Sequence, residues 1–173
     1  MLRGVEASDV IELLSALDDL DVHYWLDGGW GIDCLLGEQS RPHSDLDLVV
    51  PRPELHRITA LLVSRGFAVI RDWLPSVLAF RDGQGREVDL HLVDMTEDGG
   101  GDQVLLDGES WHYAPPVEGS IAGRTIRCSS AEDQLLMHQG YELRAIDIAD
   151  VHRIAERFGL PVPAAFDAQG EGT

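Results

Sequence analysis

Two aspartates separated by a single residue are the side chains best suited to chemistry in this sequence. Asp45 and Asp47 open an apolar run that ends at Val50. Because side chains alternate along a strand, Leu46 and Leu48 can enter the core while both carboxylates share the other face. Two carboxylates on one strand face repel each other unless a cation lies between them. Such an oxygen-rich site suits Mg²⁺, with the phosphates of a ligand completing the octahedron.

A glycine pair precedes these aspartates. Residues 22–26 are rich in Val, Tyr and Trp, which predicts a strand, and Gly28 and Gly29 follow it as a tight turn. A short helix then continues to Gly37, a typical helix stop. Glycines let the backbone approach a ligand, and the free N–H groups of a helix start predict a phosphate cradle. Each piece alone is equally typical of a glycine turn or an acidic edge strand, whereas the combination is specific.

A third carboxylate stands in the later run R-E-V-D-L-H-L-V-D. There Val88 and Leu90 share one strand face, and Asp89 and His91 share the other. A carboxylate inside an apolar strand is unfavourable unless a positive or hydrogen-bonding group meets it. An edge strand facing water would explain Asp89 equally well, but the earlier aspartates favour a shared site.

The order of these pieces, a strand, G-G, a short helix and R-x-H-x-D-x-D opening another strand, resembles the nucleotidyltransferase superfamily. Within it, Y-W-L-D-G-G-W-G-I-D, W-L-P-S, V-D-L-H, C-S-S-A-E-D-Q-L-L-M-H-Q-G-Y-E-L and I-D-I-A-D are similar to the lincosamide nucleotidyltransferases. The aminoglycoside nucleotidyltransferases share G-G-W, R-x-H-x-D-x-D and I-A-G-R-x-x-R-C but match less well around residues 138–141. The resemblance covers residues 22–154. It implies an α+β (α/β-type) nucleotidyltransferase fold, with a small mixed β-sheet flanked by helices and further helices at the C-terminus.

The reaction implied by this resemblance is transfer of AMP from ATP to a hydroxyl of a lincosamide such as lincomycin or clindamycin, with release of pyrophosphate. One or two Mg²⁺ ions would be held by Asp45 and Asp47. Asp89 would be the general base and a third metal ligand. The residues implied to bind the nucleotide are Gly28, Gly29, Trp30, Arg41 and His43, and those implied to bind the acceptor are His91, His138 and Tyr141.

Several of these residues have an ordinary alternative. Arg41 could pair with a surface carboxylate, and His43 could support the turn by hydrogen bonding. Trp30 is equally typical of a core residue, and His91 of an ordinary strand histidine. Pro42 lies within the motif, and residues 94–116 match nothing specific, so the acceptor-facing surface stays open.

Composition limits the class of protein. A chain of 173 residues is long enough for one domain with a sizeable core. The formal charge of −18 with only 13 Lys and Arg argues against a nucleic-acid surface and fits a cationic small substrate. We find neither a signal-peptide pattern nor an apolar run of membrane-spanning length, so we expect a cytoplasmic protein without a membrane partner. Cys34 and Cys128 are expected to be buried thiols. Either a monomer or a homodimer is compatible with the sequence.

We expect a catalytic core over residues 1–128, a helical segment packed on it over 129–160, and a disordered tail over 161–173. Residues 94–116 are expected to form a loop or hairpin over the site. Two other functions stay open. The acceptor could be an aminoglycoside, another natural product or a protein side chain. Alternatively, the chain could be a catalytically silent nucleotide-binding or toxin–antitoxin partner, although three retained acids argue against this.

Overall fold

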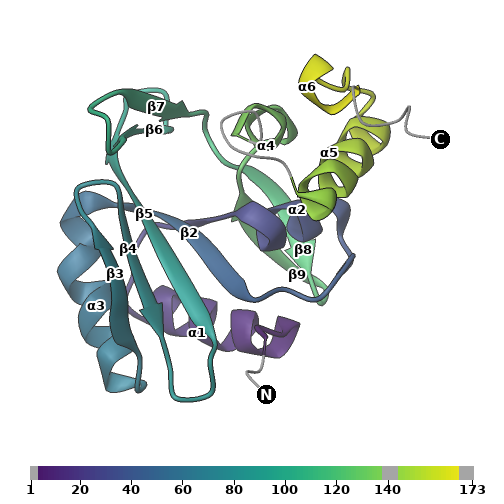
Figure 1. Ribbon diagram of the computed structural model, residues 1–173. Coiled ribbons are helices and arrows are strands. Elements are labelled where there is room, and N and C mark those ends of the chain that lie inside the picture. Colours follow the sequence, from purple (N-terminus) through teal and green to yellow (C-terminus); the bar gives the residue numbers. More distant parts are fainter. Residues whose placement is uncertain (1–3, 138–143, 168–173) are drawn as a thin grey trace.

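The computed structural model describes residues 4–137 and 144–167 (Figure 1). The helices are α1 (Ala7–Asp19), α2 (Gly28–Leu36), α3 (Leu55–Ser64), α4 (Ala131–Met137), α5 (Ala145–Phe158) and α6 (Ala164–Asp167), with a 3₁₀ turn at Arg52–Glu54. The strands are β1 (Trp25–Asp27), β2 (Asp45–Pro51), β3 (Ala68–Trp73), β4 (Val77–Arg81), β5 (Glu87–Met95), β6 (Gly101–Val104), β7 (Ser110–Tyr113), β8 (Val117–Ile121) and β9 (Arg124–Cys128).

The strands form a mixed sheet in the order β3-β4-β5-β2-β1-β9-β8. The central strands β2 and β5 run parallel, as do β1 and β9, whereas the other neighbours along this order are antiparallel. The hairpin of β6 and β7 continues from the end of β5. The expected mixed sheet with flanking helices is therefore confirmed.

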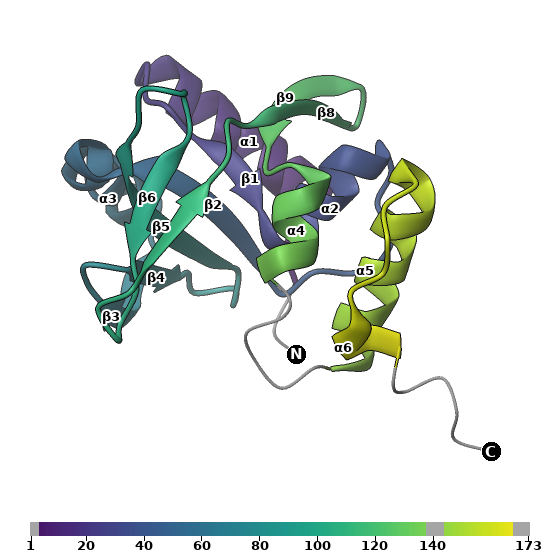
Figure 2. The same ribbon diagram turned by 90° about the horizontal axis from the view of Figure 1, so that it is seen from above.

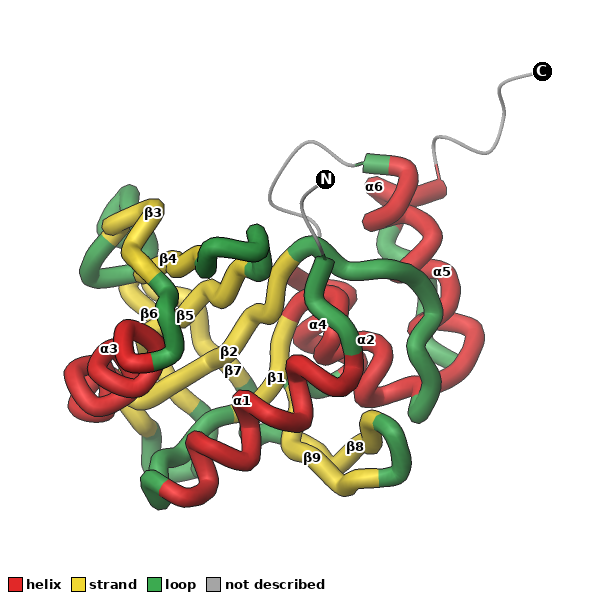
Figure 3. Tube along the Cα trace, turned by 90° about the horizontal axis from the view of Figure 1, so that it is seen from below, coloured by secondary structure: helices red, strands yellow, loops and turns green. Residues whose placement is uncertain are grey.

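Helices α1 and α3 cover one face of the sheet (Figure 3). The helical spacing of apolar residues in α1 turns Val10, Leu14 and Leu17 completely inward. They join a core that includes Leu46 of β2 and Val88 of β5. Burying each large apolar side chain contributes roughly 1.5–3 kcal/mol, so this layer is the main stabilising contact of the fold. The burial of Leu46 and Val88 in this layer also confirms the alternation of side chains predicted for β2 and β5.

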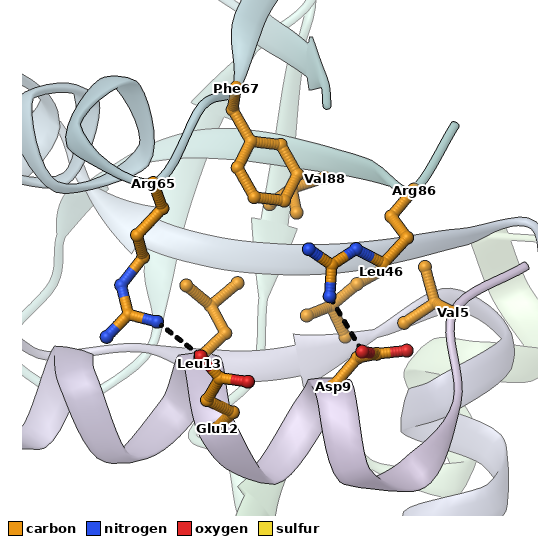
Figure 4. Close-up of a pocket in the computed structure, with 9 residues that line it drawn as sticks. All are labelled: Val5, Asp9, Glu12, Leu13, Leu46, Arg65, Phe67, Arg86 and Val88. Carbon is orange, nitrogen blue, oxygen red and sulfur yellow. Dashed lines mark hydrogen bonds and ion pairs between the residues drawn. The ribbon is translucent and has the colours of Figure 1, made fainter. Parts of the chain in front are cut away.

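Two ion pairs flank a small hollow between α1 and the sheet (Figure 4). Asp9 Oδ1 lies 2.7 Å from Arg86 Nη1, and Glu12 Oε1 lies 2.9 Å from Arg65 Nη1. The floor of the hollow includes Leu46, which lies between the two motif aspartates in sequence. The α1 layer therefore supports the carboxylate-bearing strands from behind.

The opposite face of the sheet carries the β6–β7 hairpin and, beside it, α4 (Figure 2). Tyr113 of the hairpin packs with Trp25, Val49 and Val93 of the sheet. A separate apolar cluster joins α2, α4 and α5, and it contains Ile32, Leu135, Val151 and Ile154. The candidate site lies between these two clusters, at the ends of β1, β2 and β5.

Some local expectations need correction. The strand expected over residues 22–26 is limited to Trp25–Asp27, and the glycine turn is the first turn of α2. The disorder expected from residue 161 is wrong for residues 164–167, which form α6, because Phe166 is 2% exposed and joins the apolar cluster of α2, α4 and α5. Residues 168–173 lie outside the described chain. The expected burial of Cys34 and Cys128 as free thiols is confirmed.

No helix in the described ranges has both the length and the apolar character needed to cross a membrane.

Candidate active site

Strand pairing places three carboxylates side by side on the face opposite α1. Asp27 of β1 is the register partner of Asp47 of β2, and Asp47 is the partner of Asp89 of β5. Side chains of register partners point to the same face of a sheet. Asp45 lies one row further along, opposite Glu87. The three sequence-predicted acids are therefore brought together, and Asp27 extends their row.

Asp47 is held by a histidine on one side and a glycine on the other. His91 Nε2 lies 3.0 Å from Asp47 Oδ1. Burial alone would lower the pKa of His91, but the hydrogen bond to Asp47 and the surrounding carboxylates raise it to about 9. The resulting positive charge balances Asp47. On the other side, a Cβ at Gly28 would lie 2.2 Å from Asp47 Oδ2, so only glycine allows α2 to begin here.

The two oxygens of Asp89 differ in their surroundings. Arg71 Nη2 of β3 donates to Oδ2 at 2.8 Å, whereas Oδ1 is buried without a hydrogen-bond partner among the described residues. Burial, followed by the charge of Asp47, raises the pKa of Asp89 to about 6. A carboxylate of this basicity is largely ionised at neutral pH, and its unpaired oxygen can accept a proton or meet a cation.

The acids fit the Mg²⁺ that the resemblance implies. Burial and the charge of Asp47 raise the pKa of Asp45, which is what an uncompensated pair of carboxylates produces. Within the described ranges no three ligating side chains converge into a closed cage. Mg²⁺ seldom needs one, because it is commonly held by one or two carboxylates together with waters and substrate phosphates. Asp45 and Asp47 provide such a pair, and the unpaired oxygen of Asp89 lies next in register.

A cavity of about 270 Å³ opens beside these acids at the start of α2. The backbone of Gly28 and Gly29 borders it, so helix N–H groups are available to an anion there. Two arginines also line it, which is notable in so acidic a chain. The full lining is Asp27, Gly28, Gly29, Arg41, Asp45, Asp47, His91, Gln134, Met137, Arg144 and Asp147.

Arg41 reaches this cavity while it is anchored by α5. Its Nε and Nη2 donate to Asp150 Oδ2 at 3.0 and 2.8 Å, and its Nη1 lies 2.9 Å from His43 Nδ1. The alternative that Arg41 pairs with a carboxylate is therefore correct in part, except that Asp150 is 1% exposed rather than a surface group. A guanidinium fixed at the rim of a cavity is well placed to meet phosphate oxygens.

Two residues expected to touch the nucleotide, Trp30 and His43, are buried, as their alternative roles in the core and in supporting the turn would have it. Trp30 is 1% exposed and belongs to the core, where its ring lies 4.6 Å from that of His43. His43 is also buried, and its Nε2 lies 2.5 Å from Asp33 Oδ2. Neither side chain is among the residues that line the cavity, and His43 contacts Arg41, which does line it. Of the expected acceptor residues, His91 lines the cavity, whereas His138 and Tyr141 lie outside the described residues.

Several residues of the site had no role assigned from the sequence. Asp27 is 1% exposed and accepts hydrogen bonds from Tyr113 Oη at 3.2 Å and Gln134 Nε2 at 3.1 Å. Burial raises its pKa. Its position at a strand end beside the glycine pair was visible, but its alignment with Asp47 depends on a strand pairing that no local pattern reveals. Arg71 and Asp150 were missed for the same reason, because each contacts its partner in the site from a segment that is distant in the sequence.

Comparison with known proteins identifies the family of this chain. A lincosamide resistance protein of Staphylococcus haemolyticus is 30% identical over 154 residues, which are 88% of this chain and 96% of that protein. A 2''-aminoglycoside nucleotidyltransferase of Escherichia coli is 31% identical over 123 residues, covering 70% of this chain and 66% of that protein. The crystal structure of the lincosamide antibiotic adenylyltransferase LnuA, lincomycin-bound, matches with a TM-score of 0.79 and 29% identity, covering 88% of this chain and 98% of that chain. The sequence model of the aminoglycoside-2''-adenylyltransferase family matches residues 9–154, and the chain therefore belongs to this family of nucleotidyltransferases.

Proposed function

We propose that this enzyme transfers AMP from ATP to a hydroxyl of a lincosamide, in a Mg²⁺-dependent reaction that releases pyrophosphate. The observation that carries the proposal is the alignment of Asp47 and Asp89 on neighbouring parallel strands beside the glycine-bordered cavity at α2. The lincosamide is favoured as acceptor because the Staphylococcus haemolyticus protein aligns over 96% of its length, against 66% for the Escherichia coli aminoglycoside enzyme.

In this proposal Asp45 and Asp47 hold Mg²⁺, and the backbone N–H groups at Gly28 and Gly29, with Arg41, bind the phosphates. Mg²⁺ held by these residues would supply charge neutralisation for the triphosphate and the leaving pyrophosphate. The acceptor oxygen forms a bond to the α-phosphorus as the bond between that phosphorus and the bridging oxygen breaks. The hydroxyl proton passes to Asp89 Oδ1, the oxygen that has no partner among the described residues. A base in this position contributes roughly 10²–10⁴-fold to the rate.

The test combines pyrophosphate release with mass spectrometry of the acceptor, using lincomycin, clindamycin and a panel of aminoglycosides with ATP and Mg²⁺. We expect a lincosamide to gain the mass of one AMP. Asp45→Asn is expected to abolish the product. Asp89→Asn is expected to leave ATP binding nearly intact and to remove turnover. Asp102→Asn, which changes a half-exposed carboxylate on the β6–β7 hairpin, is the matched control and should behave as wild type.

Other outcomes would distinguish the alternatives. AMP transfer to an aminoglycoside alone would keep the reaction and change the acceptor, which the family assignment also allows. ATP binding without product on any acceptor, including protein side chains, would favour a silent nucleotide-binding partner. Full turnover in Asp89→Asn would rule out the base role while leaving the metal site untouched.

A further inference from the structure

The active face of the sheet continues past Asp89 toward the edge strand. Asp89 of β5 is the register partner of Ala79 of β4, and Ala79 is the partner of Arg71 of β3. In the next row, His91 pairs with Val77, and Val77 pairs with Trp73. Arg71 and Trp73 therefore lie on the same face as the carboxylates, on the edge strand β3, which is far from α2 (Figure 1).

The cavity also bears on the direction from which the acceptor approaches. It is bordered by Gly28, Asp27 and Asp47, and it reaches His91 of β5. The attacking and leaving oxygens are on opposite sides of the transferred phosphorus. A hydroxyl that gives its proton to Asp89 can approach over β4 and β3, the strands on the side of Asp89 away from β1 and β2.

Trp73 is exposed on that path. It is 48% exposed, and the neighbouring Leu74 is 46% exposed. The guanidinium of Arg71 lies over the indole, 5.3 Å from the ring centroid, and donates to Asp89. One contact thus links the position of the aromatic ring to the position of the base. Fixing a large aromatic ring beside the reacting group, with much of its surface left to solvent, is typical of ligand sites.

The surface suits an acceptor of low charge. Ala79 lies between Asp89 and Arg71 in the row and is completely buried, so its small side chain lets Arg71 reach Asp89, and Val77 beside Trp73 is apolar. Arg71 Nη2 lies 2.8 Å from Asp89 Oδ2 and 3.7 Å from Glu87 Oε2, and Glu87 also pairs with Arg81. Apart from Asp89 Oδ1, the oxygen of the proposed base, these two carboxylates are therefore neutralised by arginines and give a polycation little to bind. An apolar ring beside a paired guanidinium fits a sugar-containing molecule with an apolar face.

We propose that Trp73, held by Arg71, is the specificity-determining platform on which the acceptor of this enzyme lies, and that it selects an acceptor with an apolar ring face and at most one positive charge. This inference rests on the proposed adenylyl transfer, and it adds the surface that chooses the substrate. Trp73 contacts the acceptor only, so its removal should affect acceptor binding and not nucleotide binding.

The test compares Trp73→Ala and Trp73→Phe with wild type in steady-state kinetics and in calorimetric binding of lincomycin. Trp73→Ala should raise the KM and the dissociation constant for lincomycin roughly 10- to 30-fold, as removal of a central aromatic contact does. Arg71 remains held by Asp89 and Glu87 without the ring, so kcat and the KM for MgATP should stay within about twofold of wild type. Trp73→Phe keeps a ring and should restore most of the affinity. Val69→Ala is the matched control. Val69 is also 48% exposed on β3, but its register partner is the buried core residue Phe80 and not a residue of the Asp89 or His91 rows. This variant should change neither the kinetics nor the binding of lincomycin.

The outcomes separate this inference from the proposed function. If wild type transfers AMP and Trp73→Ala leaves the KM of every accepted substrate unchanged, the platform is wrong and the reaction stands. A halved mass of Trp73→Ala in light scattering with unaltered lincomycin affinity would assign Trp73 to contact with a second copy and would also overturn it. If wild type modifies no acceptor, the proposed function itself fails, and calorimetry of lincomycin alone still decides whether Trp73 binds it.

Discussion

At the scale of the residue, Gly28 is the position where backbone conformation and the carboxylate site depend on each other. Its φ of +54° lies in the left-handed region, and a Cβ there would lie 2.2 Å from Asp47 Oδ2 and 2.9 Å from Asp47 Cγ. We expect Gly28→Ala to reduce kcat/KM by roughly 100-fold or more, because it displaces the carboxylate that we propose holds Mg²⁺. The variant should also weaken MgATP binding, measured by calorimetry. Backbone strain should reduce the free energy of unfolding by about 1–2 kcal/mol.

Two other glycines separate these effects. Gly123 has a φ of +79° with nothing within 4 Å of a built Cβ, so Gly123→Ala should show the loss of stability with normal activity. At Gly29 a Cβ would meet the ends of side chains, 2.5 Å from His43 Nδ1 and 2.6 Å from Arg41 Nη2. Since Arg41 can shift, Gly29→Ala should impair activity less than Gly28→Ala. Equal loss at both glycines would mean that the collision with Asp47 is not the cause.

At the scale of the element, the connector between α2 and β2 is tied back to α2 by Asp33. Its carboxylate accepts hydrogen bonds from Ser40 N at 3.0 Å and Ser40 Oγ at 2.5 Å, and it lies 2.5 Å from His43 Nε2. Burial alone would raise the pKa of Asp33, but these hydrogen bonds outweigh it and lower the pKa below its ordinary value of 3.8. The connector delivers Arg41 to the cavity, so Asp33 stabilises the site indirectly.

This arrangement predicts a dependence of stability on pH. A lowered folded-state pKa stabilises the protein fully above the unfolded value, and the contribution is lost as the pH falls through the folded pKa. We expect Asp33→Asn to reduce the free energy of unfolding by about 1.5–3 kcal/mol at pH 5, as loss of hydrogen bonds to a charged group does. The difference from wild type should shrink as the pH falls below 3.8. Urea unfolding at several pH values measures it, and a difference that persists unchanged to pH 3 would show that the ionised form of Asp33 is not responsible.

At the scale of the whole molecule, the sequence predicted what depends on local pattern and missed what depends on strand neighbours. Alternation along β2 and β5 correctly separated the core residues from Asp47 and Asp89. The row that adds Asp27 depends on β1 lying antiparallel to β2, which no run of residues specifies. Arg41 and Asp150 are 109 residues apart in the chain, and their contact exists only once α5 has packed against α2. The resemblance therefore identified Asp47 and Asp89, whereas the roles of Asp27 and Asp150 became apparent only from the tertiary structure.

The net charge of −18 leads to a prediction about the whole chain. Two unit charges about 10 Å apart in water repel by roughly 0.4 kcal/mol, and a compact state brings many such pairs together. Salt screens this repulsion, since the Debye length falls from about 30 Å at 0.01 M to about 3 Å at 1 M. We therefore expect the free energy of unfolding to rise with NaCl concentration at pH 7.

Urea is the denaturant for this measurement because it adds no ions, and a chelator prevents divalent cations from binding the carboxylates and imitating the effect. Salt also weakens favourable pairs such as Glu12–Arg65 and Asp9–Arg86. An exposed pair such as Glu12–Arg65 contributes only about 0–1 kcal/mol, and the more buried Asp9–Arg86 pair is screened less by salt, whereas the excess of negative charge acts over the whole surface. The repulsive part should therefore dominate. A free energy of unfolding that falls with added NaCl would mean that the ion pairs around α1 hold the fold more strongly than the excess charge opposes it.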